Sequence, residues 1–163
     1  GRAGASVHSL YLLTKPFDLS KYSKITIEFD YLLANLEDWT WANQSGYEFL
    51  KVDICTLGSE QCGNTDNRNT AKERLNDSSR WKNVFTDEAK PNRNKHLNGL
   101  NHSEDDFVRI TGGKVTVNLK DLGTNDFSKI MLRLNAKMDE GLKSNSSDPD
   151  AILFDNIKVK AYK

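Results

Sequence analysis

Few side chains in this sequence are spaced for acid–base, nucleophilic or metal-assisted chemistry. The chain has three histidines, His8, His96 and His102, and none of them lies in a catalytic-triad or metal-binding motif. Adjacent carboxylates occur in polar segments, for example at 104–106 (EDD), where such side chains are usually solvated. A glycosidase pair requires a defined distance between two carboxyl groups, which adjacency in a loop does not supply. The sequence therefore predicts that the protein is not an enzyme.

Two tryptophans form the most unusual short motif. Trp39 and Trp41 stand two residues apart in the polar segment Asp38-Trp39-Thr40-Trp41, which follows a predicted strand. Indole rings in a polar loop are poorly solvated unless they pack or bind. The pair is therefore either a platform for a ligand or a cover over the core beneath long loops. Trp81, at the start of another predicted strand, is expected in the core.

Two predicted strands carry polar and aromatic side chains on the side away from the core. Alternation places Tyr47, Lys51 and Asp53 on this side of one strand and Arg133 on this side of the other. Sugar-binding surfaces combine such groups, because rings pack on the apolar faces of pyranoses while charged groups bond to hydroxyls. The alternative is an ordinary solvent-facing side of a sheet.

One carboxylate of the last predicted strand falls among apolar residues. Asp155 has the same parity as Leu153, Ile157 and Val159. A carboxylate on an apolar side requires a partner. Calcium would be suitable, since it takes hard oxygen ligands, and a hydrogen-bond donor or an arginine would serve as well. Asp155 is therefore the candidate ligand of a structural calcium ion.

The two cysteines, Cys55 and Cys62, are separated by a short segment that contains a glycine. Two cysteines cannot complete a zinc site, and no histidine lies nearby at ligand spacing. We predict a disulfide that closes a small loop, which implies an oxidising compartment and hence a secreted or cell-surface protein. Two separate reduced thiols are the alternative.

Charge and hydropathy exclude two classes of partner. Lys plus Arg is 23 and Asp plus Glu is 23, whereas a nucleic-acid binder is normally basic. No run reaches the roughly 20 apolar residues of a membrane helix. The segment from Arg68 to His96 contains eight Lys or Arg and four Asp or Glu. This basic segment is either a solvated surface or a rim suited to an anionic ligand, such as a uronic-acid or sulfated polysaccharide.

The elements that position these residues are strands, which are predicted from the alternation of apolar and polar residues with a period of two. It predicts strands at Val7–Thr14, Lys24–Leu33, Tyr47–Leu57, Arg80–Thr86, Lys114–Leu119, Lys129–Lys137 and Ala151–Tyr162. A hairpin turn is expected at Gly112-Gly113, and one turn of helix at Ala71–Asn76. Long polar segments cover Gly58–Ser79 and Asp87–Asp106. Many short strands without helices predict an all-β fold, an antiparallel β-sandwich of jelly-roll type with long polar loops, as a single domain over residues 1–163.

The strand sequences resemble those of extracellular jelly-roll modules. The closing strand has an apolar pair, then Asp, Asn and Ile, in Leu153-Phe154-Asp155-Asn156-Ile157. The opening, with Lys15-Pro16-Phe17-Asp18-Leu19-Ser20 before the strand ITIEFDY, is similar as well. The resemblance is to carbohydrate-binding modules and the related MAM-type adhesion domains. It implies a jelly roll within a larger chain, a monomeric module, and a structural calcium bound by Asp155.

These expectations lead to three functional hypotheses. The first is a calcium-stabilised, non-catalytic carbohydrate-binding module that recognises a polysaccharide or glycan. The second is an adhesion domain of a large surface protein that binds a protein or peptide. The third is a small β-sandwich polysaccharide lyase or hydrolase, which the release of uronate from alginate or a related polymer would reveal.

Overall fold

The computed structural model describes residues 8–34, 38–41, 44–47, 49–88, 111–138 and 151–163. The backbone alone is described at 8, 33–34, 38–41, 44–47, 111, 138 and 151. The strands are β1 (His8–Leu13), β2 (Lys24–Ala34), β3 (Asp38–Trp41), β4 (Gln44–Tyr47), β5 (Phe49–Cys55), β6 (Lys82–Glu88), β7 (Thr111–Asn118), β8 (Met131–Met138) and β9 (Ala151–Tyr162). A helix α1 spans Arg68–Asn76, and a 3-10 helix spans Leu119–Leu122. The prediction of an all-β protein is confirmed.

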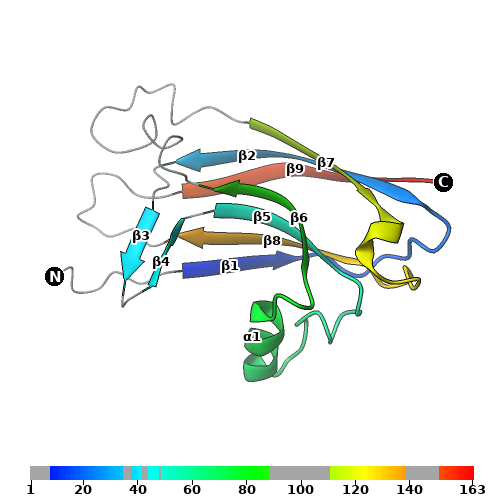
Figure 1. Cartoon of the computed structure of the whole chain (residues 1–163), viewed down its shortest axis with the longest axis horizontal. Coiled ribbons are helices and arrows are strands. Elements are labelled where there is room, and N and C mark those ends of the chain that lie inside the picture. Colours follow the sequence, from blue (N-terminus) through cyan, green and yellow to red (C-terminus); the bar gives the residue numbers. More distant parts are fainter. Residues whose placement is uncertain (1–7, 35–37, 42–43, 48, 89–110, 139–150) are drawn as a thin grey trace.

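The strands form two antiparallel sheets of unequal size (Figure 1). One sheet has four strands in the order β1-β8-β5-β6, and the other has three in the order β7-β2-β9. Strands β3 and β4 pair separately as a short hairpin. Among the described residues, neither helix has the length and apolar character of a membrane span.

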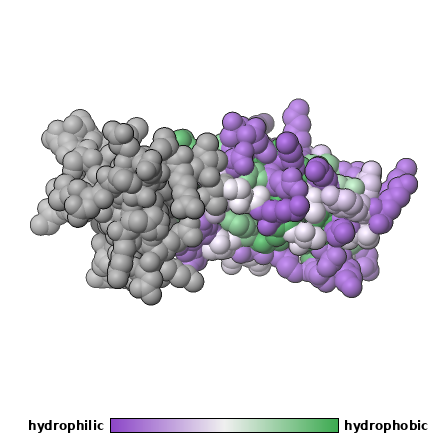
Figure 2. Space-filling view, turned by 90° about the horizontal axis from the view of Figure 1, so that it is seen from above, coloured by the Kyte–Doolittle hydropathy of each residue, from purple (hydrophilic) through white to green (hydrophobic). Residues whose placement is uncertain are grey.

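The core lies between the two sheets because alternating residues of each strand turn toward it. In β2, Ile25, Ile27, Phe29 and Tyr31 are buried, as the period of two predicts. The ring of Phe29 packs edge-on against Phe85 of β6, with ring centroids 5.0 Å apart. Each fully buried large apolar side chain contributes about 1.5–3 kcal/mol, so this shared layer is the main source of stability. Hydrophilic residues predominate on the described part of the face in Figure 2, with smaller hydrophobic areas between them.

The glycine pair expected to form a turn lies inside a strand. Gly112 and Gly113 belong to β7, and Gly113 is directly opposite Phe29 in the ladder with β2. A Cβ atom at Gly113 would stand 2.4 Å from the Phe29 ring, whereas one at Gly112 would meet nothing within 4 Å. The glycine at 113 is therefore required by a ring that crosses the strand, which the local sequence does not reveal.

A second, smaller apolar cluster covers part of the four-stranded sheet on its other side. It joins Cys55, Cys62, Trp81 and Met131, with Leu75 of α1 packed against them. The predicted disulfide Cys55–Cys62 is present, and Trp81 is buried as expected. With seven residues of sequence separation, the disulfide stabilises the fold by about 2.5 kcal/mol in a chain-entropy model.

Helix α1 is longer than the single turn predicted at 71–76. It begins at Arg68 because the Asn67 side chain accepts hydrogen bonds from the backbone N–H groups of Asn69 and Thr70, both at 3.1 Å. None of its residues is fully buried, so the helix has no apolar stripe that a sequence pattern would show.

Candidate functional site

The side chains of the four-stranded sheet that point away from the core form what we call the outer face. The strand register aligns them in rows across β1, β8 and β5. These rows are Leu13–Arg133–Asp53, Tyr11–Asn135–Lys51 and Ser9–Lys137–Phe49. The outer face thus brings together Lys51, Asp53 and Arg133, three of the residues proposed from sequence.

In the first row, Arg133 and Asp53 form a buried ion pair. Nε and Nη2 of Arg133 lie 2.9 and 2.7 Å from Oδ2 of Asp53, and the residues are only 5% and 3% exposed. Nη1 of Arg133 donates to the carbonyl of Leu75 at 2.5 Å, near the end of α1. Its guanidinium also lies 4.3 Å from the Trp81 ring centroid. This row anchors the helix to the sheet and is closed to a ligand.

The side chains of the next two rows are half-buried, apart from the exposed Ser9, and we call these the open rows. Asn135 is half-buried between Tyr11 and Lys51, and the Tyr11 hydroxyl donates to Oδ1 of Asn76 at 2.8 Å. The Lys51 ammonium lies 4.2 Å from the ring centroid of Phe49. A phenol, an amide, an ammonium and an apolar ring therefore stand side by side on rigid strands.

Two lysines bring positive charge to the open rows, and Glu88 of β6, the register partner of Phe49, brings a negative charge. Lys137 is the cross-strand partner of Phe49, and Lys51 is the next outward residue along β5. Burial lowers the pKa of Lys137, and the nearby charge of Lys51 lowers it further. A bound anion would offset this repulsion between like charges.

The remaining aromatic candidates belong to the β3–β4 hairpin, which the sequence presents as a polar loop. Trp39 is opposite Gly46 and Trp41 is opposite Gln44, while Tyr47 ends β4 two positions before β5 begins. The hairpin lies at the end of the four-stranded sheet where Phe49 starts β5 (Figure 1). The side chains of Trp39, Trp41 and Tyr47 lie outside the described residues.

Asp155 is exposed, on the outer side of the three-stranded sheet. The register between β2 and β9 shifts near Asn156, which has a φ of 54°. This bulge breaks the parity that joined Asp155 to Ile157 and Val159, and places Asp155 opposite Asp30 instead. The Asp155 carboxylate accepts from the Asn156 N–H at 2.7 Å. Asp155 is therefore not a carboxylate on the apolar side of the strand, and no described group of three His, Cys, Asp or Glu would hold a metal ion.

The basic segment 68–96 is described as far as Glu88. In that part, Arg74 is 3.3 Å from Glu60, and Arg80 is 2.9 Å from Asp77. The Lys82 ammonium donates to the carbonyl of Asp121. These three cations are engaged with the fold, Arg68 and Lys72 lie on α1, and Lys90, Arg93 and Lys95 of the proposed basic rim lie outside the described residues.

Besides Lys51, alternation within their own strands predicts the outward position of three further residues of the open rows, Phe49, Asn135 and Lys137. Tyr11 is not predicted in this way, because its place depends on β1 pairing with β8, more than a hundred residues away. No protein-family model matches this chain, and no match was found among curated proteins, so the outer face has to be interpreted from its own geometry.

Proposed function

We propose that the protein is a non-catalytic carbohydrate-binding module of jelly-roll type, secreted or displayed at a cell surface, that binds an acidic polysaccharide on the open rows of its outer face. The observation that carries this proposal is the Tyr11–Asn135–Lys51 row beside Phe49 and Lys137. Phe49 offers an apolar surface to a sugar ring, and Asn135 offers both a donor and an acceptor to its hydroxyls. The two lysines favour a carboxylated or sulfated sugar over a neutral one.

The rigid setting of these groups supports binding rather than catalysis. All of them stand on paired strands, so little backbone conformational entropy is lost when a ligand binds. A charge-assisted hydrogen bond contributes about 1.5–3 kcal/mol. We therefore expect Lys51→Ala to weaken binding by about tenfold to a hundredfold.

A glycan array that holds uronic-acid, sulfated and neutral polysaccharides tests the proposal. We expect signal on the acidic polymers that falls with added salt, and loss of that signal for Lys51→Ala and Phe49→Ala. Lys120→Ala, which removes an exposed lysine of the 3-10 helix, is the matched control and should bind like the parent protein. Absence of signal from every glycan at high protein concentration, with melting curves unchanged, would exclude a sugar-binding role.

A further inference from the structure

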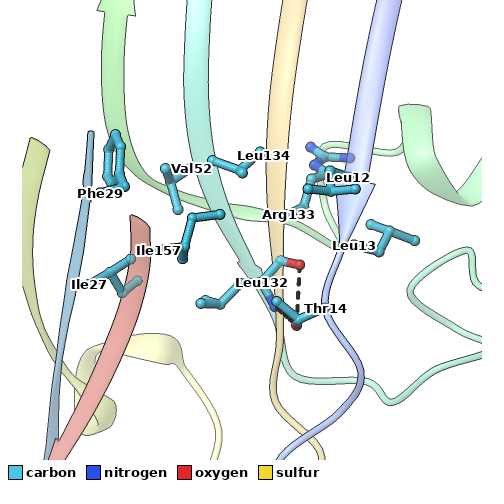
Figure 3. Close-up of a pocket in the computed structure, with 10 residues that line it drawn as sticks. All are labelled: Leu12, Leu13, Thr14, Ile27, Phe29, Val52, Leu132, Arg133, Leu134 and Ile157. Carbon is cyan, nitrogen blue, oxygen red and sulfur yellow. Dashed lines mark hydrogen bonds between the residues drawn. The ribbon is translucent and has the colours of Figure 1, made fainter. Parts of the chain in front are cut away.

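The sandwich is open along one side, because one sheet has four strands and the other has three. On β1, Leu10 and Leu12 are the register partners of the buried residues Ala136 and Leu134, so their side chains point toward the core layer. Nevertheless Leu10 is 55% and Leu12 is 51% exposed. β1 lies beyond the edge of the three-stranded sheet, so no described strand of that sheet faces β1 across the core (Figure 3).

The opposite wall of this opening is the edge strand β9. Val159 is opposite Ile27 in the ladder with β2, and with Ile157 it occupies the core side of the strand. Ile157 is 41% and Val159 is 38% exposed. Among the described strands, β9 pairs with β2 alone. The backbone N–H and C=O groups of every second residue of β9 therefore point away from the sheet.

A groove runs between these walls. Leu12 and Ile157 line it from the two sides, and Val52, Leu132 and Leu134 form its floor (Figure 3). Its lining is almost wholly apolar, and it lies on the other side of the four-stranded sheet from Lys51 and Phe49. It is therefore separate from the proposed sugar-binding face.

Charges beside the groove indicate what would fill it. On the outer side of the three-stranded sheet, Glu28 lies 3.1 Å from Lys114 and 3.9 Å from Lys160, and is opposite Lys158 in register. The row Lys114–Glu28–Lys158 thus alternates in sign across the three strands, and a carboxylate beyond Lys158 would continue the alternation. Asp30 and Asp155 lie beyond the bulge at Asn156, so this preference is confined to the part of β9 after the bulge.

We propose that the groove is a docking site for an extended segment of a partner protein, which adds to the edge of β9 as a fourth strand. Its apolar residues at every second position would cover Leu10, Leu12, Ile157 and Val159. The residues between them would be acidic and would face Lys158 and Lys160. This is β-strand addition, in which main-chain hydrogen bonds give affinity and alternate side chains give specificity.

A second copy of the chain fits the lysine-bearing part of this edge poorly. Two β9 strands paired antiparallel would set Lys158 and Lys160 of one copy against those of the other, and like charges on neighbouring strands are destabilising. Edge lysines and a bulge are also devices by which sheet proteins avoid pairing with themselves. The charge pattern therefore selects a partner of opposite sign.

The test uses a capped pentapeptide of alternating valine and glutamate, Val-Glu-Val-Glu-Val, added to the labelled protein in an NMR titration. We expect the amide signals of Ile157–Tyr162 and of β1 to shift, and the amides of Ile157–Tyr162 that point away from β2 to become protected from hydrogen exchange. A peptide with lysine in place of glutamate should bind at least about tenfold more weakly. A peptide of the same composition without alternation, Val-Val-Val-Glu-Glu, should bind more weakly as well.

Variants assign the effect to the groove. Leu12→Ser and Ile157→Ser should each weaken binding about tenfold or more, whereas Leu57→Ser, an exposed leucine outside the groove, should not. Lys158→Glu combined with Lys160→Glu should reverse the preference toward the lysine peptide, while Lys72→Glu on α1 should leave it unchanged. Melting curves of each variant show whether it is folded.

Three outcomes would overturn the proposal. They are no shift at millimolar peptide, shifts confined to the Lys51 side of the sheet, and self-association of the protein alone that Ile157→Ser abolishes. The last would show a second copy in the groove. All three can be distinguished from a failure on the glycan array, because the peptide titration does not involve a sugar.

Discussion

Arg133 joins the sheet to the helix through one guanidinium group. It pairs with Asp53, contacts the ring of Trp81 and caps a carbonyl near the end of α1. Sequence alternation correctly predicted that Asp53 and Arg133 point away from the core. It could not show that α1 and Trp81 lie over Arg133, because α1 has no apolar stripe.

Removal of the Asp53 carboxylate would leave the buried charge of Arg133 without its partner. We expect Asp53→Ala to lower the free energy of unfolding by about 3–5 kcal/mol, measured by urea denaturation. Lys129→Ala, which removes an exposed pair whose atoms are 3.7 Å apart, should change it by less than about 1 kcal/mol. Equal effects of the two changes would contradict a structural role for the buried pair.

Lys137 should make stability depend on pH. Its pKa in the folded protein is lowered by burial and by Lys51, so between that pKa and 10.5 the unfolded chain binds more protons than the folded one. Stability should therefore rise as the pH rises through the folded pKa. In Lys51→Met, an NMR titration should find the Lys137 pKa closer to its usual value, and a pKa that does not move would refute the contribution of Lys51.

At the scale of elements, β7 shows that a local sequence pattern does not contain contacts with distant strands. Its glycine pair has the composition of a hairpin turn, yet the strand continues through it because Phe29 of β2 lies across Gly113. Likewise, the Asp38–Trp41 segment is polar enough to predict a loop, and forms a strand because β4 pairs with it. Long alternating strands such as β2 and β5 were predictable because their own core contacts repeat every second residue.

The two glycines of β7 form a matched pair of positions for substitution. Gly113→Ala should lower the free energy of unfolding by about 1–3 kcal/mol, because its methyl group overlaps the Phe29 ring. Gly112→Ala should be neutral or slightly stabilising, since its methyl group meets no neighbour. Thermal or urea unfolding of both variants measures the difference, and similar values for the two would show that the ring can move aside.

For the whole molecule, sequence patterns predicted a β-sandwich but not the order of its strands. Order and register depend on pairings between distant segments, such as β1 with β8 and β2 with β9. The bulge at Asn156 shows the consequence for a candidate site, since one extra residue moved Asp155 from the expected inner side to the outer side.

A structural calcium ion remains a prediction about the whole fold. If calcium binds the folded state at Asp155, excess chelator should lower the melting temperature by several degrees, and Asp155→Asn should abolish this difference. Differential scanning calorimetry with and without chelator measures it. A melting curve that chelator leaves unchanged would exclude a structural calcium ion.

The placement of the outermost strands has a mechanical consequence. His8, which begins β1, and Tyr162, which ends β9, lie toward opposite ends of the long axis (Figure 1). Tension applied at these two points acts along the strands and loads all the bonds of a ladder together, as in shearing rather than unzipping. The β1–β8 ladder has six residue pairs and the β2–β9 ladder has ten, so β1 should detach first under load. Stretching would then remove one wall of the apolar groove while most of the sandwich remained intact.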